Sequence, residues 1–274
     1  MSSILQLAKS ELIINLRNRW IVSFAIIFMM ITFMTSYFGM VTAGYAGFQD
    51  FIRTSASLVN ICGFLIPLLA LILGVFSFIA DPEFTELMLT QPVTRHEFIL
   101  GKYLGLCMTL FGTTLIGFGL PGVIISLRIG TQGAFGYAIV VLLSLLLGMI
   151  FIGLAILISI IVKRQQLAMG MVIGVWLLFG LIYGLAVIGT TLYLSKSTLQ
   201  FSLVFLLLGN PIDLVRVLTL TVIGGTQLFG PAGASLIKLV GSQQMIYLIG
   251  GSALILWLTI PVIISGLIFQ KQDV

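Results

Sequence analysis

The sequence predicts an all-α integral membrane protein with six transmembrane helices. Of its 274 residues, 59% are hydrophobic and only 8% are charged, whereas soluble domains carry about 25% charged residues. So few charges leave no polar coat for a water-soluble globule. Apolar stretches of about 20 residues recur along the chain, and this length favours helices over the alternating strands of a membrane barrel. The formal net charge of +5 is scattered along the chain, which argues against nucleic acid as a partner.

Apolar stretches and polar segments define the predicted elements of a single transmembrane domain. We expect an interfacial helix over 2–19 and transmembrane helices over 20–41, 57–80, 103–127, 135–162, 167–194 and 244–269. A cytosolic coupling loop over 81–102 separates the second and third of these helices. An outer re-entrant segment over 195–243 separates the fifth and sixth.

The opening segment has a moderately amphipathic pattern. Its apolar side is formed at helical spacing by Ile4, Leu5, Ala8, Leu12 and Leu16, with Lys9 and Asn15 intruding. Arg17 and Arg19 then meet Trp20, a boundary typical of the cytoplasmic membrane face. A signal peptide is disfavoured, because the apolar run after Trp20 is about 20 residues long and a signal core has roughly 7–15.

Features inside the membrane helices predict bends and contacts. Pro67, in the middle of the second helix, frees a backbone carbonyl that neighbouring helices or water must satisfy. A tight polar turn at 163–166 joins the fourth and fifth helices. Along the fifth helix, small residues share about 120° of arc at 3.6 residues per turn: Gly170, Gly174, Gly180 and Gly184. Such a face lets helix backbones approach closely, either within one chain or between two copies.

The outer segment is too polar and too rich in glycine and proline to form one span. Its apolar run 201–208 is less than half of the roughly 20 residues that a span needs. Asn210-Pro211 is expected to end this run and to start another short helix. Asp213 and Arg216 then lie three residues apart on that helix, where they can pair.

The distribution of basic residues predicts the orientation. With the N-terminus inside, eight of the 13 Lys and Arg residues are cytoplasmic. They are Lys9, Arg17, Arg19, Arg95, Lys102, Lys163, Arg164 and Lys271, and the outer five are Arg53, Arg128, Lys196, Arg216 and Lys238. The positive-inside rule therefore favours both termini in the cytosol.

The chain lacks the residue patterns of membrane enzymes and of ion-coupled carriers. Every acid and base can be placed near a helix end or in a loop, whereas coupled carriers keep ionisable groups at membrane depth. No Walker A sequence occurs, and Leu100 stands where the second histidine of H-E-x-x-H is needed. Cys62 and Cys107 have no C-x-x-C partners. The methionines of the first helix suit either copper handling or plain packing. We expect no catalytic, cofactor or metal site, and no enzyme activity.

The segment 81–102 is the longest stretch that does not fit into lipid, and its residues are ordered. Phe84, Leu87 and Met88 share one helical face, while Glu83 and Glu86 face water. We interpret this pattern as a stiff amphipathic helix that docks on another protein. A catalytic loop or a solvated connector would not need this order.

A second helix start follows within the same segment. Thr94 precedes Glu97 by three residues, the spacing of a capping box. The third transmembrane helix is therefore expected to begin in the cytosol and to enter the membrane at Lys102-Tyr103.

This segment resembles the cytosolic loop of ABC-2 type ABC transporter permeases, which reads roughly E-x-x-x-G-T-L-E-x-L-L-x-x-P-[VI]-[ST]-R-x-x-x-x-x-G-K. The matching residues are Glu83, Glu86, Leu87, Leu89, Pro92, Val93, Thr94, Arg95, Gly101 and Lys102, with Phe84-Thr85 in place of the usual G-T. Residues 11–20 and 210–216 are also similar to the family. The latter, followed by 229–233, look most like the NosY type, which serves nitrous oxide reductase maturation.

The resemblance implies a type V exporter-like fold in a bacterial or archaeal cytoplasmic membrane, surrounded by membrane lipid. The implied partners are a cytosolic ABC ATPase that binds ATP and Mg, a second permease copy or related subunit, and a periplasmic NosD-like protein. The implied ATPase-docking residues are Glu83, Phe84, Glu86, Leu87, Met88, Arg95, Lys163 and Arg164. The implied outer gate or partner site is Asn210, Pro211, Asp213 and Arg216. The alternatives are an ABC-2 exporter of a lipid, drug or peptide, a membrane-bound enzyme, and a membrane anchor without transport.

Overall fold

The computed structural model describes residues 3–41, 48–79, 94–129, 131–193, 196–224, 235 and 241–271. Within these ranges every regular element is a helix. Those before the segment 80–93 are α1 (Ser3–Leu16), α2 (Arg19–Val41) and α3 (Phe48–Ile79). Those after it are α5 (Arg95–Ile129), α6 (Thr131–Val162), α7 (Gln165–Leu177), the π-helix η1 (Leu178–Ile182), α8 (Tyr183–Tyr193), α9 (Lys196–Leu208), α10 (Pro211–Val222) and α12 (Gln243–Gln270).

Six helical segments in the described ranges are long and apolar enough to cross a membrane, which confirms the predicted number. They are formed by α2, α3, α5, α6, the continuous α7–η1–α8 helix, and α12. A bent pair, 201–208 with 211–222, changes direction by 103° at its break, so it is a broken span or a re-entrant loop. The break falls at the predicted Asn210-Pro211 position.

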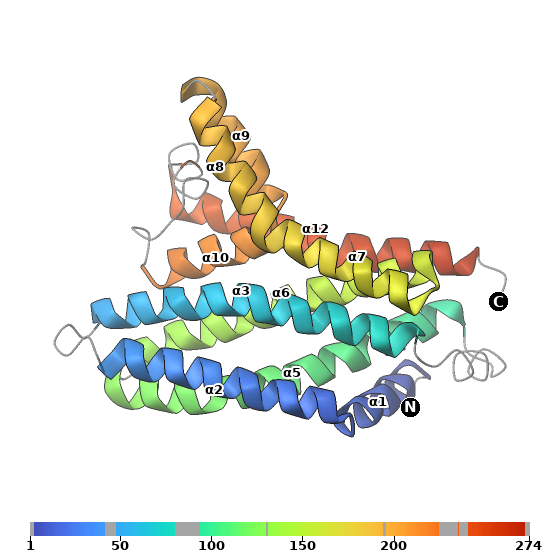
Figure 1. Ribbon diagram of the computed structural model, residues 1–274. Coiled ribbons are helices and arrows are strands. Elements are labelled where there is room, and N and C mark those ends of the chain that lie inside the picture. The colour runs from blue at the N-terminus through green and yellow to red at the C-terminus, as the bar shows by residue number, and fades with distance from the viewer. Residues whose placement is uncertain are drawn as a thin grey trace.

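Helices α3 and α6 form the centre of the bundle. They pack extensively on each other, with α2 and α5 on one side and α7 and α12 on the other (Figure 1). Large side chains at their contact are fully buried, among them Ile66, Leu71 and Phe151. Pro67 lies inside α3, and the carbonyl of Phe64 one turn earlier accepts a hydrogen bond from Trp176 Nε1 at 2.8 Å. A neighbouring helix thus supplies a donor to the backbone one residue after Gly63, whose carbonyl loses its helical partner to Pro67.

Several chain segments that are distant in sequence meet at one end of the bundle. Helix α1, the end of α3, the starts of α5 and α7, and the end of α12 all lie there (Figure 1). The segment 80–93, which contains the predicted docking helix, therefore leaves and rejoins the described fold at the same end as both terminal helices.

Some helices extend beyond the transmembrane bounds that the sequence predicted. Helix α3 begins at Phe48 instead of residue 57, and α5 and α6 almost meet, ending at Ile129 and beginning at Thr131. Arg53 and Arg128, which were placed in loops, are therefore helical. The reason is that arginine is a good helix former, so one charged residue ends an apolar stretch without ending the helix.

The face of the first helix that packs on the protein is not its predicted apolar side. Its buried residues are Leu7, Ala8, Glu11 and Asn15, and they pack against α5. Leu5 and Leu16, which belong to the predicted apolar side, are exposed. The side of α1 that meets the protein thus carries a carboxylate and an amide. Its position at a membrane surface stays a prediction.

Candidate functional site

The start of α5 is held by a capping box. Thr94 N and Thr94 Oγ1 each donate to Glu97 Oε2 at 2.9 Å, and Glu97 N donates to Thr94 Oγ1 at 3.3 Å. These reciprocal bonds satisfy backbone groups that a helix start leaves free, and they confirm the predicted cap. Ser3 Oγ of α1 donates to the other carboxylate oxygen, Glu97 Oε1, at 2.6 Å. The local cap is thereby linked to the N-terminal helix.

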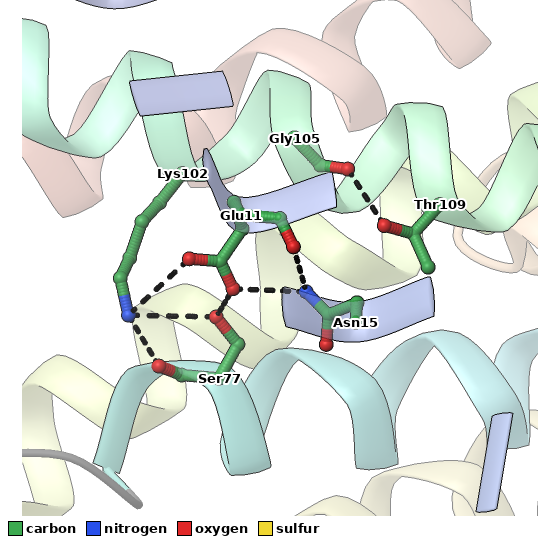
Figure 2. Close-up of polar contacts among 6 residues, drawn as sticks. All are labelled: Glu11, Asn15, Ser77, Lys102, Gly105 and Thr109. Carbon is green, nitrogen blue, oxygen red and sulfur yellow. Dashed lines mark hydrogen bonds and ion pairs between the residues drawn. The ribbon is translucent and has the colours of Figure 1, made fainter. Parts of the chain in front are cut away.

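A buried polar cluster joins three helices just inside this end of the bundle. We call Glu11, Asn15, Ser77 and Lys102 the anchor cluster; they come from α1, α3 and α5 (Figure 2). Lys102 Nζ lies 3.9 Å from Glu11 Oε2 and donates to the backbone oxygen of Ser77. Ser77 Oγ donates to Glu11 Oε1, and Asn15 Nδ2 donates to the same oxygen at 3.0 Å.

Both charges of the anchor cluster are removed from solvent. Glu11 is 5% exposed and Lys102 is 3% exposed. Burying a charge is costly unless partners and hydrogen bonds replace its hydration. Lys102 Nζ also lies 5.3 Å from the ring centre of Phe78 and 5.7 Å from that of Phe98, within the range of cation–π attraction. Each charge is thus stabilised only while α1, α3 and α5 stay together.

The anchor cluster pairs an acid with a base inside the protein, which the sequence analysis did not predict. Lys102 is buried, and its place at the membrane boundary stays a prediction. The pairing could not be read from the sequence, because Glu11 and Lys102 lie 91 positions apart. The spacing of Glu11 and Asn15, four residues apart on one helical face, was the available signal of a polar contact surface.

Two glycines let α1 approach α5 this closely. A Cβ atom at Gly101 would lie 2.6 Å from Leu7 Cβ, and one at Gly105 would lie 2.8 Å from the oxygen of Ala8. Gly101 and Gly105 have the small-xxx-small spacing that permits close helix packing. This pair was not singled out as a packing site in the sequence, although its spacing could have indicated one.

The end of α12 is attached to the same place. Arg95 Nη1 donates to the backbone oxygens of Phe269 at 3.0 Å and Gln270 at 3.1 Å. A cation at a helix C-terminus stabilises carbonyl groups that lack partners in the helix. The ring of Phe269 stacks on Phe98 at 5.9 Å and meets the edge of Phe78 at 6.0 Å. Both flanks of the segment 80–93 are therefore joined to α12 as well as to α1.

The predicted ATPase-docking residues fall into three groups. Arg95 is half-buried and binds the end of α12, so its guanidinium is shared with the fold instead of lying at an open rim. Lys163 and Arg164 are exposed in the tight turn between α6 and α7, where Lys163 has a φ of 55°. The remaining predicted residues lie outside the described ranges: Glu83, Phe84, Glu86, Leu87 and Met88.

The predicted outer residues surround the break between α9 and α10. Asn210 caps α10 by accepting a hydrogen bond from Ile212 N, and Pro211 occupies the first turn. Asp213 Oδ2 accepts from Asn210 Nδ2 at 2.9 Å. Arg216 lies close enough to act electrostatically on Asp213, but the two side chains do not form a close ion pair in the described part of the chain. The carboxylate has a nearer donor in the capping residue of its own helix.

The four glycines of the fifth helix do not share one environment. A Cβ at Gly180 would lie 3.1 Å from Phe64, whereas at Gly170, Gly174 and Gly184 it would meet nothing within 4 Å. The π-helix η1 lies between the first and last of these glycines and changes the angular register of the residues after it. Packing within the chain therefore explains only Gly180.

A family model described as an ABC-2 family transporter protein matches residues 5–274. Two curated relatives both have the name "Probable ABC transporter permease protein NosY". The one from Pseudomonas aeruginosa is 35% identical over 227 residues, which cover 78% of this chain and 80% of the relative. The one from Stutzerimonas stutzeri is 30% identical over 281 aligned positions, which cover 99% of both chains.

Proposed function

Since the chain belongs to the ABC-2 family of transporter proteins, we propose that it couples ATP hydrolysis by a separate cytosolic ATPase to movement of its membrane helices. In this proposal ATP and Mg bind to the partner ATPase, and the chain itself is not an enzyme. It is a multi-pass permease subunit with six candidate spans. Its own contribution is mechanical: the permease receives a force at one end and changes the arrangement of its helices.

The anchoring of the segment 80–93 is the observation that carries this proposal. Its two flanks, at Ser77-Phe78 and Arg95-Lys102, are joined to α1 through the anchor cluster and to α12 through Arg95 and Phe269. A displacement of the segment therefore moves α1, α3, α5 and α12 together. A solvated connector between two spans would not require a buried ion pair and two terminal helices at its base.

The sequence of that segment supports a docking role. Phe84, Leu87 and Met88 recur at helical spacing, as in helices that insert apolar side chains into a groove of a partner. Glu83 and Glu86 would lie at the rim of the contact. Lys163 and Arg164, exposed at the start of α7, lie at the same end of the bundle (Figure 1) and would extend the docking surface.

The orientation follows from the same assignment. The ATPase is cytosolic, so the end with the segment 80–93 and both terminal helices faces the cytosol of a bacterial or archaeal cell. The Lys and Arg distribution supports this orientation independently. An impermeant thiol reagent applied to intact cells is expected to label Ser197→Cys and not Arg164→Cys. Labelling at position 164 from outside would reverse the assignment.

A second copy of the chain is proposed to complete the permease. The span α7–η1–α8 is the least covered of the six, with 11% of its apolar window buried. Gly170 and Gly174 lie on its uncovered side, opposite the buried Ala168 and Val172. Small residues on an open helix face suit a close contact with another helix. We therefore assign this face of α7 to a homodimer contact.

The downstream process is proposed to be maturation of the copper sites of nitrous oxide reductase, with a NosD-like protein on the outer face. The names of both relatives support this assignment. The outer residues Asn210, Pro211, Asp213 and Arg216 would then form part of the gate or of the partner contact. Deletion of the gene is expected to leave nitrous oxide reductase deficient in copper. Normal copper content in the reductase of the deletion strain would exclude this role.

Co-expression with the proposed partner ATPase tests the coupling itself. The purified pair, reconstituted into nanodiscs, is expected to hydrolyse ATP at a rate that depends on the intact permease. An ATPase that binds the permease but whose rate never responds to permease variants would favour the anchor without transport. Failure of the two proteins to associate would contradict the proposal.

A further inference from the structure

The fifth span contains a wide helical turn in its middle. In η1, the N–H of Tyr183 bonds to the oxygen of Leu178, five residues earlier. In a regular α-helix it would bond to the oxygen of Phe179, four residues earlier. The turn therefore releases the Phe179 carbonyl from its helical partner. Such π-turns are uncommon, and a buried carbonyl without a partner is costly.

The side chain of Asn210 occupies the released acceptor. Asn210 Nδ2 donates to Phe179 O at 3.1 Å and to Asp213 Oδ2 at 2.9 Å, while Asn210 Oδ1 accepts from Ile212 N at 3.0 Å. Asn210 is only 1% exposed. Both amide hydrogens and the amide oxygen thus have partners. One residue caps α10 and also supplies the hydrogen bond that the π-turn needs.

Further contacts hold the same break between α9 and α10. Trp257 Nε1 of α12 donates to Leu208 O, at the end of α9, at 3.0 Å. The Trp257 ring also meets the ring of Phe179 edge-on at 5.5 Å. A Cβ atom at Gly209 would clash with the Tyr183 hydroxyl. The break therefore contacts both the fifth and the sixth span directly.

We propose that Asn210 is a positioning residue that holds the π-turn of the fifth span and ties it to the bent pair α9–α10. The bond from Asn210 to Phe179 O stabilises the wide turn relative to a regular α-helix. Without it, the Phe179 carbonyl is buried without a partner, so the wide turn opens more often and holds α8 less firmly relative to α7. Movement of the fifth span and movement of the bent pair are therefore one event. The role of that event in the transport cycle rests on the proposed function.

Two substitutions separate this role from helix capping. Ser and Asp are as good as Asn at a helix N-cap, so Asn210→Ser and Asn210→Asp both keep the cap. Neither has an amide that can donate to Phe179 O. Asn210→Ser leaves a small cavity and Asn210→Asp adds a charge. The defect that the two variants share is therefore the loss of the amide donor to Phe179 O. Ser242→Asn is the matched control, because Ser242 caps α12 and, within the described ranges, its side chain bonds only to that helix.

Hydrogen–deuterium exchange of the purified full-length chain in nanodiscs tests the bridge without any partner. Both Asn210 variants are expected to accelerate exchange roughly tenfold in residues 178–184 as well as in 211–216, and the control is expected to change neither. Faster exchange in 211–216 alone would reduce Asn210 to a helix cap, and unchanged exchange in both would overturn the proposal. If one variant is not recovered from the membrane, the other decides the comparison.

A second measurement addresses the cycle. The variants are expected to bind the ATPase like the wild-type chain but to lose at least half of its permease-dependent ATPase rate. A wild-type rate in variants whose exchange is accelerated would show that the bridge has no role in coupling. If the wild-type chain itself fails to bind the ATPase, the proposed function fails, while the exchange result still decides whether the bridge exists.

Discussion

Lys102 Nζ of α5 lies 3.9 Å from Glu11 Oε2 of α1, and both side chains are buried. The two residues are far apart in the sequence and lie at the base of the segment 80–93. Their pairing makes the N-terminal helix part of the structure that supports this segment. A buried ion pair of this kind contributes little net stability when intact, but removing one partner is strongly destabilising.

Loss of one charge from this pair is expected to destabilise the fold. Lys102→Met leaves the Glu11 carboxylate buried without its cation, and we expect a loss of about 3–5 kcal/mol in the free energy of unfolding. Glu11→Gln keeps the size of the side chain and its bonds to Asn15 and Ser77. Reversible unfolding in mixed micelles measures both variants and the double mutant. The double mutant should lose less than the sum of the single losses, and strict additivity would show that the pair is not coupled.

The contact between α1 and α5 is expected to depend on Gly105. Gly105→Leu would force the new side chain into Ala8 and Glu11, displace α1 and expose its residues to protease. Gly112→Leu on the same helix is the control, because its Cβ meets nothing within 4 Å. Limited proteolysis near the N-terminus measures the difference. Equal cleavage rates in the two variants would show that α1 is not held by this contact.

The docking segment is expected to depend more on its apolar residues than on its charges. Leu87→Asp places a carboxylate among the spaced apolar side chains and should abolish association with the ATPase. Glu83→Ala removes a rim charge and should weaken association by less than about 1 kcal/mol. Co-purification and ATPase rate measure both variants. Full assembly and activity in Leu87→Asp, with the protein in the membrane, would contradict the docking role.

The close approach at the break between α9 and α10 gives a compensation test. Gly209→Ala is expected to lower the melting temperature, because the added methyl group meets the Tyr183 hydroxyl. Tyr183→Phe removes that hydroxyl and leaves the ring carbon Cζ 3.4 Å from the added Cβ, which is an ordinary contact. The double mutant should therefore be more stable than Gly209→Ala alone. A double mutant with the same melting temperature would place the defect elsewhere.

The proposed homodimer contact is expected to be sensitive at Gly174. A Cβ atom added at Gly174 meets nothing within 4 Å and the position is exposed, so Gly174→Leu should leave the fold intact and separate the two copies. Gly119→Leu, at another exposed helix position with open space, is the control. Mass measurement of the detergent-solubilised protein by light scattering distinguishes monomer from dimer. A dimeric Gly174→Leu variant would remove this face from the contact.

Signals confined to a few neighbouring residues were enough to predict much of this protein. The length of each apolar stretch predicted six spans, because a bilayer requires about 20 apolar residues in a helix. The capping box of Thr94 and Glu97 and the break at Asn210-Pro211 were predicted for the same reason. The hydrogen bonds that form them join residues at most four positions apart, and no other part of the chain is needed to specify them.

Tertiary structure alone decided which residues meet between helices. The pairing of Glu11 with Lys102 and of Asn210 with Phe179 O joins different helices, and helical periodicity says which side chains share a face but not what that face meets. The same limit explains why the sequence left open which face of α1 meets the protein and what each glycine of the fifth span meets. A buried charge or a π-turn is unfavourable in an isolated helix, and each becomes stable only when a second helix supplies the missing partner.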